Sequence, residues 1–231
     1  MRLYYMTSAD IGLIILHERR MKLSLYNELN DPFELLSHAL GDKLMRKAHK
    51  ALQEHFTKTK GVICFSDNWK SPVMWAHYAQ KHYGFCLGFD LPVGHPDQER
   101  VFAMNYEPER LRFEFEKEKW TEEVGLSFIR QIMTTKAKAW EYEHEWRAMA
   151  DLKEQDPNGF YYVDFSERMQ LREVILGARN TLSVGKVAKL VKEKGPLPAS
   201  IQVLRARIAH KTFSIVMNRE VTPIMVKGSQ E

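Results

Sequence analysis

Short runs with apolar residues at every second position constrain the fold of this chain most. In HYGFCLGFD, residues 82–90, the pattern places Phe85, Leu87 and Phe89 on one side of an extended chain. Similar runs predict further strands at residues 3–7, 21–26, 61–66, 101–106, 140–150, 160–165, 172–178, 200–208 and 213–218. Helical patterns are fewer, at about residues 8–19, 33–56, 72–80, 107–139 and 182–194. Because the strands outnumber the helices and do not alternate regularly with them, we expect an α+β fold: a single mixed, mainly antiparallel sheet of about eight strands with four to five helices.

Length and composition predict one domain. With 231 residues, of which 44% are hydrophobic, the chain can bury a large core. No internal repeat, low-complexity segment or linker divides the sequence. We expect a single α+β domain over residues 1–219 and a flexible C-terminal tail over residues 220–231.

Charge and cysteine usage limit the partners and the compartment. A formal net charge of +4 is too small and too evenly spread to indicate a nucleic-acid groove or a membrane surface. Cys64 and Cys86 lie in apolar runs, as reduced buried thiols do, which indicates a cytoplasmic protein. The N-terminus lacks an apolar signal core, and no uncharged run approaches the roughly 20 residues of a membrane-spanning helix. We therefore expect a soluble protein without membrane contact.

The densest cluster of charge is WEYEHEWR, residues 140–147. Its alternation predicts a strand whose core face is aromatic, with Trp140, Tyr142, His144 and Trp146, and whose opposite face is charged, with Glu141, Glu143, Glu145 and Arg147. Carboxylates on one strand face, roughly 7 Å apart, repel one another unless Arg147, Lys136, Lys138 or a ligand compensates. The charged face is either a solvated surface on which Arg147 pairs with Glu145, or a cleft wall that binds a ligand hydroxyl or stabilises a cationic transition state.

NDPFE, residues 30–34, has a structural interpretation and a functional one. Asp31 can cap a helix, Pro32 can occupy the first helical turn, and Glu34 then stands at the third helical position of a capping box. Capping does not explain Asn30, which either faces a ligand or holds the turn. We expect residues 30–34, 64–66, 75–78 and 143–147 to build one polar cleft, in which Asn30, Asp31 and Arg147 are ligand-binding candidates.

PVMWAHYAQKHYG, residues 72–84, concentrates aromatic and histidine side chains on a short predicted helix. Trp75, Tyr78 and Ala79 share one side of that helix, which we expect to pack against the protein. The alternative is that the ring of Trp75 or Tyr78 stacks on a flat ligand. His77 is displaced from them, either as a buried, hydrogen-bonded histidine or as a ligand-binding or acid-base group. His77 and His82 lack partners at metal-binding spacing, so we expect no metal site.

Common catalytic signatures are missing from the sequence. It contains no glycine-rich dinucleotide fingerprint, Walker loop, H-E-x-x-H, G-x-S-x-G or paired C-x-x-C. Ser66, in CFSD, has no histidine base nearby in the sequence.

Several motifs together resemble a large bacterial family of domains of unknown function. These motifs are LNDPFE, ICFS, MWAHYAQKHYGFCLGFD, KAKAWEYEHEWR and VILGAR, and the resemblance covers about residues 3–210. The first strand of that family usually begins Leu-Tyr-Lys-Tyr, whereas this chain has LYYM at residues 3–6. The family itself implies no established activity.

A second resemblance, at the level of fold alone, implies a chemistry. An aromatic strand (LYYMT), a helix, a strand, a later strand that ends in serine (ICFS) and a Glu-x-Glu occur in an order that is similar to the ADP-ribosyltransferase fold. The resemblance implies that Glu145 binds the nicotinamide-ribose 2′-hydroxyl of NAD and stabilises an oxocarbenium-like transition state. It implies that Glu143 orients the acceptor.

The same resemblance assigns the remaining ligand-binding positions. Tyr5 or Thr7 takes the first-strand position, where the fold usually has histidine or arginine. Ser66 takes the middle position, and Tyr78 stacks on nicotinamide.

We therefore expect an NAD-consuming transferase or glycohydrolase, in a toxin or phage-defence setting. NAD would be its substrate, no cofactor would be tightly bound, and the protein or nucleic-acid acceptor is open. The alternative is a non-catalytic regulatory module that binds a nucleotide, a nucleic acid or a protein. A metal-independent nuclease ranks last.

Overall fold

A computed structural model describes residues 1–41, 43–93, 100–112, 121–193 and 199–228. The α-helices are α1 (Ala9–Glu18), α2 (Lys43–Thr59), α3 (Pro72–Tyr78), α4 (Glu122–Thr134) and α5 (Val184–Glu193), and the 3₁₀ helices are η1 (Tyr26–Glu28) and η3 (Lys138–Glu143). The strands are β1 (Arg2–Thr7), β2 (Arg20–Lys22), β3 (Lys60–Ser66), β4 (Phe85–Asp90), β5 (Val101–Ala103), β6 (Asn105–Glu107), β7 (Thr135–Ala137), β8 (Glu145–Asp151), β9 (Tyr162–Asp164), β10 (Gln170–Leu176), β11 (Ile201–Ile208), β12 (Ile215–Met217) and β13 (Ile224–Val226).

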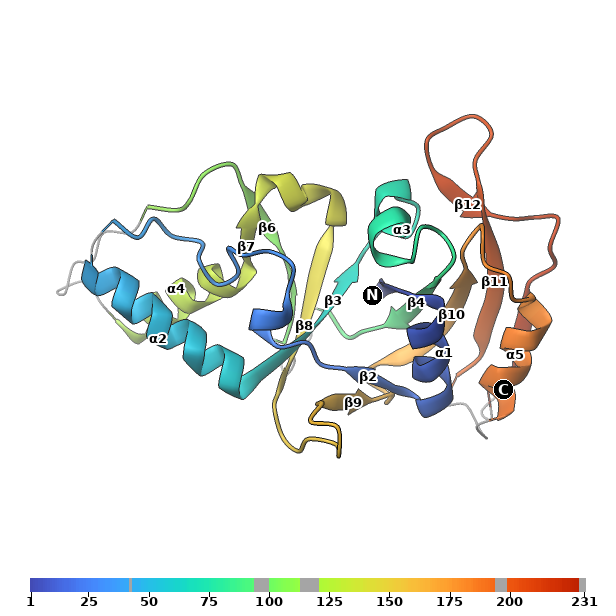
Figure 1. Cartoon of the computed structure of the whole chain (residues 1–231), viewed down its shortest axis with the longest axis horizontal. Helices are drawn as coiled ribbons and strands as arrows, with labels where there is room; N and C mark the ends of the chain where they lie inside the picture. The colour runs from blue at the N-terminus through green and yellow to red at the C-terminus, as the bar shows by residue number, and fades with distance from the viewer. Residues whose placement is uncertain (42, 94–99, 113–120, 194–198, 229–231) are drawn as a thin grey trace.

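One large sheet organises the molecule (Figure 1). Nine strands form it, in the order β12-β11-β10-β4-β1-β3-β8-β5, with β13 also paired to β11. The β10–β11 pair is parallel, and the other pairs of this sheet among the described residues are antiparallel. The predicted α+β class and the mixed, mainly antiparallel sheet are confirmed.

Helices cover both faces of this sheet. The predicted apolar face of β4, with Phe85, Leu87 and Phe89, packs in the core that α1 and α5 cover, while Cys86 faces the core under α3. A third core, which includes Phe56 of α2 and residues of α4, lies at the other end of the molecule (Figure 1). Because β3 and β8 run toward that end, the two halves of the molecule meet at these strands.

Two of the predicted helices are shorter than their sequence patterns suggested. The helix expected over residues 33–56 begins at Lys43 instead, because the chain adopts turns after Pro32 and Leu35 takes the left-handed conformation, with φ of 60°. The helix expected over residues 107–139 forms only in part, as α4. Its first expected residue, Glu107, belongs to the strand Asn105–Glu107. Residues 113–120 of this prediction lie outside the described residues.

The expected flexible tail is partly structured. β13 pairs with β11 through the Ile201–Val226, Gln202–Met225 and Val203–Ile224 registers. Val226 is buried in the main core. The prediction of a loose chain from residue 220 is therefore wrong for residues 224–226, while residues 229–231 lie outside the described residues.

Candidate functional site

A pocket opens beside the sheet where β1 and β3 separate. These two strands are paired at Tyr4 and Ser66, and β1 continues along β4 while β3 continues along β8. The cavity has a volume of about 270 Å³. It is lined by Tyr4, Tyr5, Met6, Lys22, Ser24, Glu28, Leu29, Asn30, Glu34, Ile63, Cys64, Phe65, Ser66, Met74, Tyr78, Lys136, Glu143, Glu145 and Arg147.

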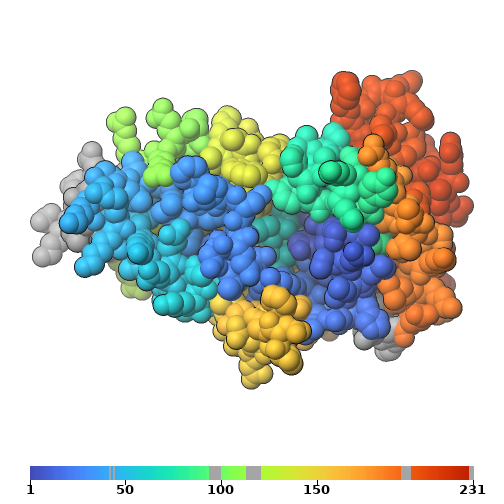
Figure 2. Space-filling view, in the orientation of Figure 1, coloured from blue at the N-terminus to red at the C-terminus, as the bar shows by residue number. Residues whose placement is uncertain are grey.

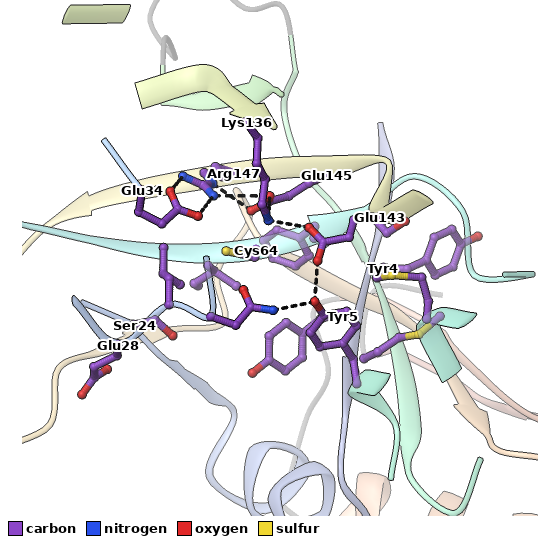
Figure 3. Close-up of a pocket in the computed structure, with 18 of the residues that line it drawn as sticks. Tyr4, Tyr5, Ser24, Glu28, Glu34, Cys64, Lys136, Glu143, Glu145 and Arg147 are labelled. Atoms are coloured by element: carbon purple, nitrogen blue, oxygen red, sulfur yellow. Dashed lines mark hydrogen bonds and ion pairs between the residues drawn. The ribbon is translucent and has the colours of Figure 1, made fainter. Parts of the chain in front are cut away.

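Five charged side chains form a row along one wall of the pocket (Figure 3). In spatial order they are Glu34, Arg147, Glu145, Lys136 and Glu143. All five are buried, and their charges alternate in sign. Three carboxylates and two cations leave the row with a net charge of −1, so the wall favours a neutral or cationic ligand group.

Arg147 occupies the inner part of the row. Its two terminal nitrogens donate to the two carboxylate oxygens of Glu34, each at 2.6 Å, and its Nε donates to Glu145 Oε1 at 2.7 Å. Such two-point contacts fix the direction of both groups as well as binding them. Arg147 therefore orients Glu145 instead of presenting an unoccupied guanidinium to a ligand.

Lys136 joins the two glutamates that sequence analysis singled out. Its Nζ donates to Glu143 Oε2 at 2.5 Å and to Glu145 Oε2 at 2.9 Å. The Tyr78 hydroxyl donates to the other oxygen of Glu143, and Asn30 Nδ2 donates to the Tyr78 oxygen at 2.8 Å. The expected compensation of the carboxylates by Arg147 and Lys136 is thus present.

The pKa values of the two glutamates are displaced in opposite directions. Burial alone would raise the pKa of Glu145, but Arg147 and Lys136 outweigh it and bring the value to about 2. Burial raises the pKa of Glu143 above its usual range, although Lys136 and Tyr78 partly oppose that rise. Glu145 is therefore a permanent anion, whereas Glu143 is the carboxylate that can exchange a proton nearer neutral pH.

Lys136, Tyr78 and Cys64 keep their ordinary charge state in the pocket. Burial opposes protonation of Lys136, but Glu145 and Glu143 raise its pKa, so the ammonium group stays charged. Burial and then the hydrogen bond to Glu143 raise the pKa of Tyr78, so its hydroxyl stays a donor. Burial raises the pKa of Cys64 far above its usual range, which makes this thiol a poor nucleophile.

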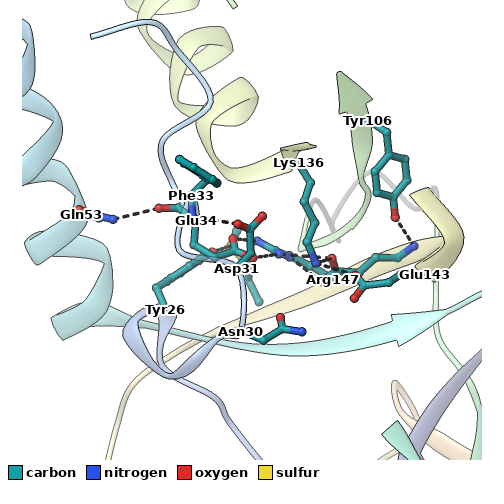
Figure 4. Close-up of polar contacts among 12 residues, drawn as sticks. Tyr26, Asn30, Asp31, Phe33, Glu34, Gln53, Tyr106, Lys136, Glu143 and Arg147 are labelled. Atoms are coloured by element: carbon teal, nitrogen blue, oxygen red, sulfur yellow. Dashed lines mark hydrogen bonds and ion pairs between the residues drawn. The ribbon is translucent and has the colours of Figure 1, made fainter. Parts of the chain in front are cut away.

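A turn, and not a helix N-terminus, places Glu34 (Figure 4). Asp31 Oδ1 accepts a hydrogen bond from the Phe33 backbone at 2.9 Å, and the Glu34 backbone oxygen accepts from Gln53 of α2 at 2.9 Å. The capping-box prediction is wrong because the left-handed Leu35 ends this turn before a helix can continue. Glu34 is freed from a capping role and pairs with Arg147 instead.

WEYEHEWR does not form the predicted continuous strand. Trp140 to Glu143 belong to η3, His144 is left-handed with φ of 47°, and β8 begins at Glu145. The burial is the reverse of the expectation, because the charged side chains at 143, 145 and 147 are buried while His144 is exposed. Of the predicted aromatic face, Tyr142 and Trp146 are half-buried and pack against the cores. The solvated-surface reading is wrong for residues 143, 145 and 147, although its Glu145–Arg147 pair exists.

The pocket brings most of the predicted site residues together. It is lined by Tyr5, Asn30, Ser66, Tyr78, Glu143, Glu145 and Arg147. Ser66 lies opposite Tyr4 of β1 and Glu145 of β8 in the sheet register, which explains how the three strands converge on one wall. Its hydroxyl also accepts a hydrogen bond from the Asn68 backbone at 3.1 Å.

Four predicted ligand-binding residues lie outside the pocket lining. Thr7 is buried at the end of β1, and the Asp31 side chain stabilises its own turn. Trp75 is fully buried, and its indole donates to the Trp69 carbonyl at 2.6 Å. His77 is exposed on α3 near the Tyr142 ring, so neither the buried-histidine reading nor the pocket reading holds.

Sequence reasoning missed several residues of the site. The sequence patterns include residue 34 in the predicted cleft but give the Glu34 side chain only a capping role, and they give Lys136 only the role of a counter-charge. The rim residues Lys22, Ser24 and Glu28 carried no motif, and Lys22 and Glu28 form an ion pair at 3.2 Å. An acidic residue in a turn rich in apolar neighbours was the available signal for Glu34.

Within the described residues, no group of three or more His, Cys, Asp or Glu side chains could hold a metal ion. No helix among those residues is long and apolar enough to cross a bilayer.

The segment that carries most of this wall also carries the family resemblance. Residues 74–148 match the model of the family described as Protein of unknown function (DUF2971). The resemblance to a family of unknown function is thereby confirmed. The match runs from within α3 to the first part of β8 and includes Tyr78, Lys136, Glu143, Glu145 and Arg147. No curated protein and no solved structure matches the chain.

Proposed function

We propose that the pocket is an active site that breaks the bond between nicotinamide and ribose in NAD, as an ADP-ribosyltransferase or an NAD glycohydrolase. The observation that carries the proposal is the carboxylate pair of Glu143 and Glu145, which share the Lys136 ammonium at 2.5 and 2.9 Å on one pocket wall. Their pKa values are driven apart, a pattern typical of sites in which one carboxylate stays charged and its neighbour exchanges a proton.

Cleavage of the bond between nicotinamide and ribose requires mainly a negative charge placed beside the ribose. The C1′–N bond breaks, and its electron pair leaves with nicotinamide, which departs neutral because it begins as a pyridinium cation. The ribose carbon becomes an oxocarbenium-like cation, which an adjacent carboxylate stabilises. Water or an acceptor hydroxyl then forms a bond to C1′ and gives its proton to Glu143.

The contacts and charges of the two glutamates support roles that differ from those that the ADP-ribosyltransferase resemblance implies. Arg147 and Lys136 hold the pKa of Glu145 at about 2, so Glu145 acts as a fixed negative charge, whereas burial raises the pKa of Glu143. Glu143 is the group that transfers the proton. Tyr78 and Asn30, linked to it by hydrogen bonds, position the ligand.

The size and charge of the pocket support a nucleoside as the occupant. A volume of about 270 Å³ is near the lower end of ligand-binding cavities and fits the nicotinamide-ribose half of NAD. The wall has a net charge of −1, which favours a pyridinium cation over a phosphate. The phosphates and the adenosine would therefore lie outside this cavity.

The test is nicotinamide release from NAD by the purified protein and by Glu143→Gln. We expect the substitution to lower the rate at least about a hundredfold. Gln keeps the size and the hydrogen-bonding positions of Glu143, so folding should survive, and thermal unfolding would check this. Glu141→Gln is the matched control, since Glu141 is an exposed glutamate on the same 3₁₀ helix and should leave turnover unchanged. Equal rates for both variants and the wild type would refute the proposal.

A second candidate function is a non-catalytic nucleotide-binding module. The closed Glu34–Arg147–Glu145 contacts favour it, because a row that is already internally satisfied can serve as a rigid wall. This candidate predicts an NAD- or nucleotide-dependent rise in melting temperature without nicotinamide release. Glu143→Gln would then reduce the thermal shift alone.

A further inference from the structure

A second concave surface lies on the same side of the molecule as α3. The β11–β12 hairpin, whose tip is residues 209–214, stands out from the body (Figures 1 and 2). Between this hairpin and α3 lies a groove of about 380 Å³. It is lined by Pro72, His82, Ile208, Ala209, His210, Lys211, Thr212, Phe213, Ser214 and Ile215.

The hairpin exposes large apolar side chains to solvent. Phe213 is 101% exposed and Ile208 is 62% exposed. In the antiparallel register Ile208 lies opposite Ile215, which is buried against the core under α3. The hairpin is therefore anchored at its base and holds the Phe213 ring away from the rest of the protein. A fully exposed ring does not stabilise the fold, whereas it can contact a partner.

The charge around this ring is entirely positive along the chain. Residues 194–219 contain no aspartate or glutamate, while Lys211 lies within the tip and Arg207 precedes it. The backbone oxygen of Lys70 accepts a hydrogen bond from Ile215, which brings this exposed lysine beside β12. Among the described residues no ion pair joins Lys70 or Lys211 to a carboxylate.

The floor of the groove adds a polar group. His82 lies in the lining, and its ring is stacked on Trp75 with an interplanar angle of 6°. Its Nδ1 is buried and has no hydrogen-bond partner among the described residues. The imidazole therefore contributes a half-buried flat ring to the groove floor, while its Nδ1 stays beneath the surface.

We propose that this groove and hairpin bind single-stranded nucleic acid, with Phe213 stacked on a base and Lys211 and Lys70 facing phosphates. A single exposed aromatic ring among cations is sufficient for base stacking, and stacking requires a base face that a duplex would hide. The neighbours of Phe213 at the tip are Lys211, Thr212 and Ser214. Polar neighbours of this kind fit a nucleotide better than the broad apolar face that insertion into a membrane requires. The inference does not depend on the proposed NAD chemistry.

The experiment measures, by fluorescence anisotropy, the binding of fluorescein-labelled single strands of DNA and of RNA at several salt concentrations. Each strand has about 12 nucleotides, which is within the typical range of site sizes. We expect Phe213→Ala to weaken binding about tenfold. Lys211→Glu should weaken binding and reduce the slope of log affinity against log salt by about 1 or more.

Matched controls come from the exposed loop before β9, which is far along the chain from the hairpin. Lys153→Glu changes the net charge by the same amount as Lys211→Glu, and Phe160→Ala removes another exposed phenylalanine. All four positions are exposed, so the variants should fold, and circular dichroism would check this. Equal weakening by Lys211→Glu and Lys153→Glu, or no effect of Phe213→Ala, would overturn the proposal. So would Phe213-dependent binding to anionic phospholipid vesicles without binding to either strand.

Discussion

Arg147 and Glu34 form a two-point ion pair in the protein interior although 113 positions separate them in the chain. Both contacts measure 2.6 Å, and both side chains are buried. The pair ties the turn before α2 to β8, the strand next to the β5 edge of the sheet. The geometry of the pocket wall therefore depends on correct folding of this turn, which is not part of the sheet.

Removing Glu34 should destabilise the protein strongly. In Glu34→Ala, Arg147 remains buried with Glu145 as its one remaining carboxylate partner among the described contacts, and breaking such a buried pair typically costs about 3–5 kcal/mol. Urea denaturation followed by circular dichroism would measure the loss. Glu28→Ala is the control, because its pair with Lys22 is solvent-exposed and should contribute less than about 1 kcal/mol. Similar unfolding midpoints for both variants would contradict a structural role for the Glu34–Arg147 pair.

Replacing Lys136 should make stability depend on pH in a new way. In Lys136→Met, Glu143 and Glu145 lose the cation that lowers both of their pKa values, so both pKa values rise. A group with a raised native pKa adds stability at low pH and loses it as the pH rises through that pKa. The deficit of the variant relative to wild type should therefore be smaller at pH 5 than at pH 8. Denaturation curves at the two pH values would show this, and a constant deficit would argue against the shared ammonium.

Two buried histidines should make the wild-type protein less stable in mild acid. Burial, and then the proximity of His49, lower the pKa of His38, and burial lowers the pKa of His49. For a depressed native pKa the unfolded chain takes up protons first, so stability falls as the pH drops from about 6.5 toward the native values. Unfolding free energies at pH 7.5 and 5.5 would measure the loss. His49→Phe, which cannot gain a proton, should show a smaller loss than wild type over the same interval.

The thiol in the pocket should be chemically inert in the folded protein. Burial, reinforced by Glu145, raises the pKa of Cys64 well above its usual range, so little thiolate exists at pH 8. Cys86 is also buried with a raised pKa. We expect a chromogenic disulfide reagent to modify neither cysteine rapidly until denaturant is added. Fast modification of one thiol in the native protein, absent in Cys64→Ala, would show that the pocket admits and activates a thiolate.

Local patterns predicted the strands well and the site only in part. The period-two pattern of Phe85, Leu87 and Phe89 placed β4 correctly, because one face of that strand is buried under helices along its length. The same pattern failed at WEYEHEWR, where the left-handed His144 separates a 3₁₀ helix from the strand. Alternation describes which residues share a face only when the backbone is extended throughout.

The role of Glu34 in the charged row depends on a distant contact. Nothing near Glu34 in the sequence indicates that Arg147 lies beside it, and a capping box uses the same residue types at the same spacing. The deciding feature was the backbone of Leu35, a residue type that seldom adopts a positive φ, so no propensity rule marks it. Tertiary packing of Leu35, which is 2% exposed, compensates for that conformation.

The alternating row of charges also makes the pocket dependent on complete folding of the chain. Its members come from the turn before α2, from β7, from η3 and from β8, and each ion neutralises the next. A chain in which any one of these segments is out of place leaves an unpaired charge inside the protein, which is strongly unfavourable. Partly folded chains are therefore poorly able to display a finished pocket, and its activity or binding would appear in a single step with the completed fold.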